Sequence, residues 1–144
     1  MPPPGKKPGL PEVLFFHTVS IEQYGGSEGV RDKESLLAAI ERPWQASFGQ
    51  EHFVSTFERA AALMESIIRR HPFVDGNKRT ATATASYLLS TFGHEIESEQ
   101  QDLEDFAVSV AVGGMEATEI SHWFERHRRK SCDSRIDKTL DGGI

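Results

Sequence analysis

The sequence predicts an all-α fold, a compact bundle of about six helices with a short flap or hairpin. Apolar residues recur every three or four positions along most of the 144 residues, as on the buried face of a helix. Glycine, proline or a capping residue separates these periodic runs. Only residues 44–52, which include Gly49, alternate loosely, and they predict a short hairpin or an irregular flap.

The N-terminal part predicts two helices. The first spans about residues 11–24 and is stopped by Gly25-Gly26. The second begins after Asp32, a typical N-cap, and ends before Pro43. Their apolar positions are Val13, Phe16, Ile21, Leu36, Leu37 and Ile40.

The central part predicts two more helices around a short loop. One covers residues 57–68, and the other is alanine-rich, runs from about Asn77 to Thr91 and is stopped by Gly93. Their larger apolar residues are Phe57, Met64, Ile67, Ile68, Tyr87, Leu88 and Phe92.

The C-terminal part predicts the last two helices. Ser98 and Gln101 have capping-box spacing before a helix that Gly113-Gly114 closes. Trp123 and Phe124 mark the final helix and are expected in the core. We therefore expect one domain over residues 10–130, a disordered tail over 1–9 and a flexible tail over 131–144.

Composition limits the possible partners and compartment. The net charge of −6 argues against a nucleic-acid binder, which usually carries a basic face. No apolar run approaches the roughly 18 residues of a membrane span, so no membrane partner is expected. The N-terminus lacks the apolar core of a secretory signal. Cys132 is the single cysteine and is expected to be an inert thiol, which fits a cytoplasmic location.

The loop between the two central helices carries most of the candidate chemistry. It leads into a helix start, where unpaired N–H groups and the helix dipole favour an anion. Gly76 allows close approach of a ligand, and the Asn77 side-chain amide can donate to a phosphate oxygen. Lys78 and Arg79 add positive charge. These features predict a polyphosphate cradle.

The same segment holds a candidate base and a candidate metal ligand. His71 can remove a proton from a hydroxyl nucleophile that attacks phosphorus. Asp75 can hold Mg²⁺, which binds through one or two carboxylates and substrate phosphates. Phe73 is expected to pin the loop into the core.

A purely structural role for these residues is the alternative. His71 suits a helix C-terminus, and Asp75 could be a simple N-cap. Lys78 and Arg79 argue against this alternative, because cations are unfavourable in the first turn of a helix and bound phosphate would relieve that cost.

The segment resembles the signature of the Fic/Doc superfamily, H-x-F-x-(D/E)-G-N-x-R. The segments 29–32, 38–43 and 57–61 resemble the Doc branch, and the resemblance covers about residues 10–124. It implies a Fic/Doc-type helical bundle. All fixed signature positions are present: His71, Phe73, Asp75, Gly76, Asn77 and Arg79.

Two departures favour the Doc branch over AMP-transferring relatives. Lys78 stands where those enzymes usually have glycine, and Thr82 stands where they have a second arginine. Gly76 points the other way, because Doc has alanine there. The transferred group, phosphoryl or AMP, therefore stays open at the level of sequence.

The resemblance implies an activity and roles for the site residues. A Doc-type toxin is implied to use ATP with Mg²⁺ and to phosphorylate a hydroxyl of elongation factor Tu, which stops translation. His71 would be the general base, and Asp75 would place magnesium or orient His71. Gly76, Asn77, Lys78 and Arg79 would bind the nucleotide.

The resemblance also bears on the target and on regulation. Residues 44–53 look like the flap that holds a target segment by strand pairing, or they are an ordinary loop. The inhibitory motif (S/T)-x-x-x-E-(G/N) is absent, because Gln23 follows Thr18 to Glu22. Restraint is then expected in trans, from an antitoxin. A catalytically silent Fic-fold binding module is the remaining alternative.

Overall fold

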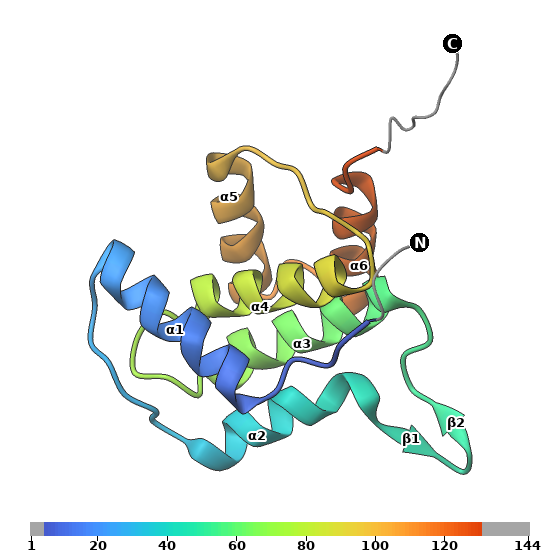
Figure 1. The fold of residues 1–144 in the computed structure, drawn as a ribbon, viewed down its shortest axis with the longest axis horizontal. Helices are drawn as coiled ribbons and strands as arrows, with labels where there is room; N and C mark the ends of the chain where they lie inside the picture. The colour runs from blue at the N-terminus through green and yellow to red at the C-terminus, as the bar shows by residue number, and fades with distance from the viewer. Residues whose placement is uncertain (1–4, 131–144) are drawn as a thin grey trace.

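The structure is a computed structural model that describes residues 5–130, and the tail predicted for residues 131–144 lies outside them. This part of the chain forms six α-helices, of which α3 is the most deeply buried (Figure 1). The elements are α1 (Leu10–Tyr24), α2 (Lys33–Glu41), the 3₁₀ turn η1 (Arg42–Trp44), β1 (Ala46–Ser47), β2 (Gln50–Glu51), α3 (Thr56–Arg70), α4 (Asn77–Thr91), α5 (Gln100–Ala111) and α6 (Ala117–Arg126).

Helix α3 is the centre of the fold. It packs against α2, α4, α5 and α6, and residues 60–68 are all buried. Its start is fixed by a capping box, in which Ser55 accepts from the Glu58 N–H and the Glu58 carboxylate accepts from the Ser55 N–H. The predicted all-α class is confirmed. The loop that holds His71 follows the C-terminal end of α3.

The N-terminal helices follow the sequence prediction closely. Helix α1 ends where Gly25 adopts a φ of 82°. Asp32 caps α2, because its carboxylate accepts from the Ser35 N–H at 3.1 Å. The chain then continues through Pro43 as one 3₁₀ turn, since a proline at the start of such a turn needs no N–H partner.

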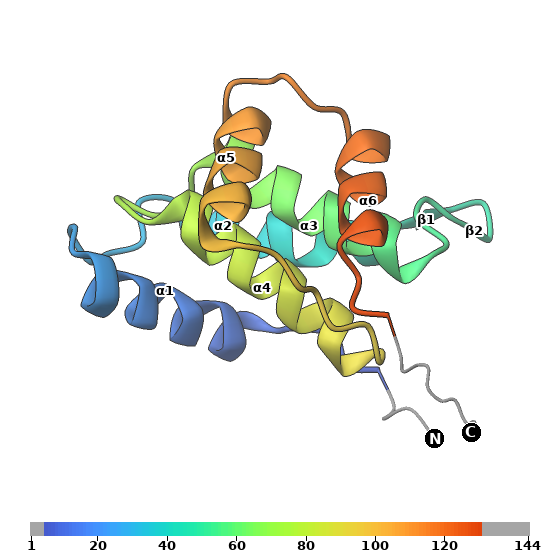
Figure 2. The same cartoon turned by 90° about the horizontal axis from the view of Figure 1, so that it is seen from above.

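The predicted hairpin exists, but it lies away from the loop that holds His71. Strands β1 and β2 pair with Ala46 opposite Glu51 and Ser47 opposite Gln50. The hairpin precedes the start of α3, whereas His71 follows its end, and a 15-residue helix is about 22 Å long. Figures 1 and 2 both show the hairpin at the far end of α3. This arrangement does not support the idea that the hairpin is a flap that holds a target segment next to His71.

One predicted cap is wrong. Helix α5 begins at Gln100 after Glu99, and the Ser98 hydroxyl donates to the Glu99 carbonyl instead of accepting from the helix. In α6 the prediction of core residues is confirmed. Phe124 is fully buried, and the Trp123 ring stacks on Phe106 at 3.9 Å between centroids.

Residues 5–9 of the predicted N-terminal tail differ from the prediction of disorder, and residues 1–4 of that tail lie outside the described residues. Residues 5–9 run along the end of α4, where the Lys6 N–H donates to the Thr91 hydroxyl at 3.1 Å and Lys7 lies over the Trp44 ring. Gly9 then caps α1. Among residues 5–130, no helix is long and apolar enough to cross a membrane.

Candidate functional site

The loop between α3 and α4 starts with a residue in an uncommon conformation. His71 has φ 54° and ψ 55°, the left-handed region that residues with a Cβ rarely adopt. This turn takes the chain out of α3 and leaves His71 exposed to solvent. Phe73 is fully buried two residues later, as the sequence predicts. The loop is therefore anchored in the core by Phe73, while His71 faces solvent.

The side chain of Asn77 holds this loop closed. Its Oδ1 accepts from the Phe73 N–H at 3.0 Å, and its Nδ2 donates to the Phe73 carbonyl at 2.9 Å. Asn77 is only 4% exposed. In this structure the side chain is engaged by the backbone of the loop, and its expected contact with a phosphate stays a prediction. The backbone N–H of Asn77 is a further donor at the helix start.

The structure adds a second reason for glycine at position 76, besides the expected close approach of a ligand. Its φ is 79°, and a Cβ there would meet Ile21 Cδ1 at 3.3 Å and Ser20 Oγ at 3.4 Å. The added carbon would point toward α1. Glycine suits this position because the helix start adopts a left-handed backbone in tight contact with α1.

A buried histidine that the sequence did not single out supports the loop from α1. The His17 ring stacks on Phe73 at 3.9 Å between centroids, and its Nε2 donates to the Asp75 carbonyl at 2.9 Å. The sequence signal that could have identified His17 is its position on the apolar face of the helix, four residues from both Val13 and Ile21. His17 ties the loop to the fold and is 95% buried, since only 5% of it is exposed.

The start of α4 offers N–H groups and positive charge together. The first helical bond is from the Thr80 N–H to the Gly76 carbonyl, and Gly76 has no side chain to cap the three preceding N–H groups. Lys78 and Arg79 are exposed, and the first turn has no acidic residue. The Arg79 guanidinium lies over the Tyr24 ring, 3.8 Å from its centroid.

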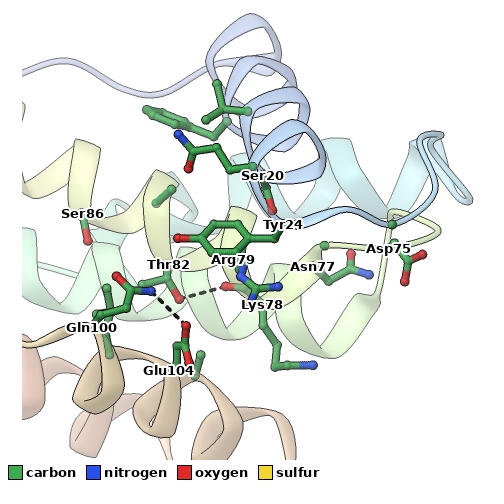
Figure 3. A pocket seen from close by; sticks show the side chains of 18 of the residues that line it. Ser20, Tyr24, Asp75, Asn77, Lys78, Arg79, Thr82, Ser86, Gln100 and Glu104 are labelled. Atoms are coloured by element: carbon green, nitrogen blue, oxygen red, sulfur yellow. Dashed lines mark hydrogen bonds between the residues drawn. The ribbon is translucent and has the colours of Figure 1, made fainter.

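A pocket of about 680 Å³ opens beside this helix start. Figure 3 shows its wall, formed by α1, α4 and α5. Its wall includes the backbone and cations of residues 76–79 and apolar side chains, among them Phe16, Leu103 and Ala107. His71 is not part of the pocket wall. The pocket thus has a cationic part at residues 78 and 79, and His71 lies outside its wall.

Asp75 lies where the loop meets the connector between α1 and α2. Its Oδ2 accepts from the Ser27 N–H at 2.9 Å, and the residue is exposed. Its other oxygen has no protein donor among the contacts described. Within residues 5–130 no cluster of three or more His, Cys, Asp or Glu side chains could hold a metal unaided. One carboxylate fits Mg²⁺ that also uses substrate phosphates, the usual binding mode of this ion.

The fold and the loop define the class of protein. A buried helix ends at an exposed histidine, and a glycine-led helix start follows within six residues. The sequence matches the Fic/DOC family over residues 9–89, which is more than half of the chain. The chain therefore belongs to the Fic/DOC family.

Two of the curated relatives are named Doc, which supports the Doc branch of the family. The sequence is 40% identical over 76 residues to a toxin Doc of Mycolicibacterium smegmatis, a match over 53% of this chain and 58% of that toxin's length. It is 30% identical over 115 residues to the protein kinase doc of Escherichia phage P1, a match over 80% of this chain and 90% of that kinase. The chain is also 28% identical over 112 residues to an alanine–tRNA ligase of Synechococcus, a match over 78% of this chain and 11% of that ligase.

Proposed function

We propose that this protein is a Doc-like toxin that transfers the γ-phosphoryl group of ATP to a hydroxyl of a target protein. The observation that carries the proposal is the uncapped start of α4, with Lys78 and Arg79 exposed beside a pocket of nucleotide size. A relative named protein kinase doc, aligned over most of both chains, supports phosphoryl transfer. Elongation factor Tu is the target we propose to test first.

The nucleotide would bind with its phosphates at the start of α4. The backbone N–H groups of residues 77–79 and the two cations would neutralise phosphate charge, because the helix dipole adds to both. The apolar side chains of the pocket wall would contact the rest of the nucleotide. Asp75 would hold Mg²⁺, which supplies charge neutralisation at the phosphates when it is bound.

His71 would act on the target. Its imidazole would accept the proton of the target hydroxyl as that oxygen forms a bond to the γ-phosphorus. The bond from phosphorus to the bridging oxygen breaks, and ADP leaves with that oxygen. The exposed position of His71 suits a protein substrate, because such a substrate must approach from solvent.

Labelled ATP distinguishes this reaction from its alternatives. The purified protein is incubated with Mg²⁺, elongation factor Tu or a cell extract, and ATP labelled at the α- or γ-phosphorus. Label transferred from the γ-position alone supports the kinase. Label from the α-position shows AMP transfer and overturns phosphoryl transfer, and no label from either overturns both and leaves the silent binding module.

Restraint by an antitoxin is the second part of the proposal. Glu22, in the position nearest to an inhibitory glutamate, is exposed and is not part of the pocket wall. The described chain thus offers no glutamate from this motif to block the phosphate end. Co-expression of the gene with its neighbour should relieve toxicity if that neighbour encodes the antitoxin, and should leave toxicity unchanged otherwise.

A further inference from the structure

Arg31, in the connector between α1 and α2, contacts the C-terminal end of α3. Its Nε donates to the His71 carbonyl at 2.7 Å, and its Nη2 donates to the Arg70 carbonyl at 2.9 Å. The last carbonyls of a helix have no partner within the helix and carry partial negative charge. The guanidinium therefore caps α3 from a residue 40 positions away in sequence.

The next carbonyl is held by the same segment. The Pro72 carbonyl accepts from the Arg31 N–H at 2.7 Å and from the Asp32 N–H at 3.0 Å. Three successive carbonyls, of residues 70–72, are thus fixed by residues 31 and 32. They enclose the left-handed turn at His71, a conformation that a residue with a Cβ adopts only when its surroundings impose it.

The connector is itself fixed on both sides of Arg31. The Val74 N–H donates to the Gly29 carbonyl at 3.0 Å, and Val30 forms an antiparallel bridge with Phe73. On the other side, Asp32 caps α2. The backbone of Arg31 is therefore fixed relative to the loop that holds His71.

We propose that Arg31 is a positioning residue for His71, which holds the imidazole in its exposed orientation through the backbone. This inference rests on the proposed function in one respect, the role of His71 as a base. Lysine cannot replace arginine fully here, because an ammonium is a point charge and does not offer two parallel donors to neighbouring carbonyls.

The first experiment measures the position without using activity. In ¹⁵N,¹³C-labelled protein, we expect a scalar coupling across the hydrogen bond from Arg31 Nε–H to the His71 carbonyl. We expect Arg31→Lys to shift the His71 backbone and imidazole signals. The matched control is Arg59→Lys, which removes a similar bond from Nε to the Phe53 carbonyl near the start of α3 and should leave the His71 signals in place. Absence of the coupling, or unchanged His71 signals in Arg31→Lys, would overturn the proposal.

The second experiment measures phosphoryl transfer by the same variants. We expect Arg31→Ala to lower kcat by about 10- to 100-fold, because small misplacements of a catalytic group cost about that much, and to leave the KM for ATP unchanged. Added guanidinium chloride at low millimolar concentration should restore part of kcat in Arg31→Ala but not in His71→Asn. An unchanged kcat in Arg31→Ala overturns the proposal. If the parent protein transfers nothing, the proposed function fails, whereas the NMR result still decides the role of Arg31.

Discussion

The Arg79 guanidinium lies over the ring of Tyr24, with 3.8 Å between Cζ and the ring centroid (Figure 3). Tyr24 is the last residue of α1, and Arg79 lies in the first turn of α4. An arginine stacked by its face keeps its N–H groups free in the plane for a phosphate. Tyr24 at the end of α1 thus holds the Arg79 guanidinium in the wall of the pocket.

Removal of the Tyr24 ring should therefore weaken ATP binding. A cation–π contact at an exposed site is worth about 0.5–1 kcal/mol, so Tyr24→Leu should raise the Kd for ATP by about 2- to 5-fold. Tyr24→Phe is the matched control and should bind like the parent, because it keeps the ring. Isothermal titration calorimetry measures both. Equal losses in the two variants would show that the hydroxyl matters and not the ring.

Substitution of His71 should separate catalysis from binding. Asparagine tolerates the left-handed backbone better than alanine does, so His71→Asn should stay folded. Loss of a general base should lower the transfer rate by about 10²- to 10⁴-fold, while the Kd for ATP stays the same. The control is His122→Asn, an exposed histidine on α6. A His71→Asn variant that is as toxic in cells as the parent would contradict the assignment.

Asn77 should contribute to stability more than to ligand contact. Asn77→Ala leaves the buried N–H and C=O of Phe73 without partners, and each such group costs about 1–3 kcal/mol. We expect the free energy of unfolding to fall by about 2–4 kcal/mol in urea denaturation. Asn77→Asp keeps the acceptor but loses the donor and buries a carboxylate beside the Phe73 carbonyl, so it should also be destabilised. Full stability in Asn77→Ala, with weaker ATP binding, would instead support the direct phosphate contact.

The cap of α3 should make stability depend on pH. Hydrogen bonds from the N–H groups of Ser55 and then Val54 lower the pKa of Glu58 below its ordinary value of 4.5. A lowered pKa stabilises the fold fully above the unfolded value, and this contribution is lost as pH falls through the folded pKa.

We therefore expect Glu58→Gln to be less stable than the parent at pH 7. The difference should shrink once the pH falls below 4.5, the ordinary value of this carboxyl. Urea denaturation across this range measures it. A gap that stays constant down to pH 3, or one that the exposed control Glu125→Gln reproduces, would exclude the charge of Glu58 as the cause.

The sequence determined the helices because their limits depend on local chemistry. Asp32 caps α2 and Gly25 ends α1, and each acts on neighbouring residues only. The residues of the Fic/Doc signature are also close together in sequence. The loop and the start of α4 at Asn77 could therefore be predicted without a structure. The cap predicted at Ser98 is wrong because α5 begins one residue later, after Glu99.

Tertiary structure decided how the loop is held and what lies beside it. Asn77 turned inward to the Phe73 backbone, His17 reached the loop from α1, and Arg31 reached the end of α3 from another segment. The hairpin was predictable as a hairpin, but its distance from His71 follows from the length of α3. The contacts of His17 and Arg31 join residues far apart in the chain, and periodicity and capping patterns carry no information about which distant segments pack together.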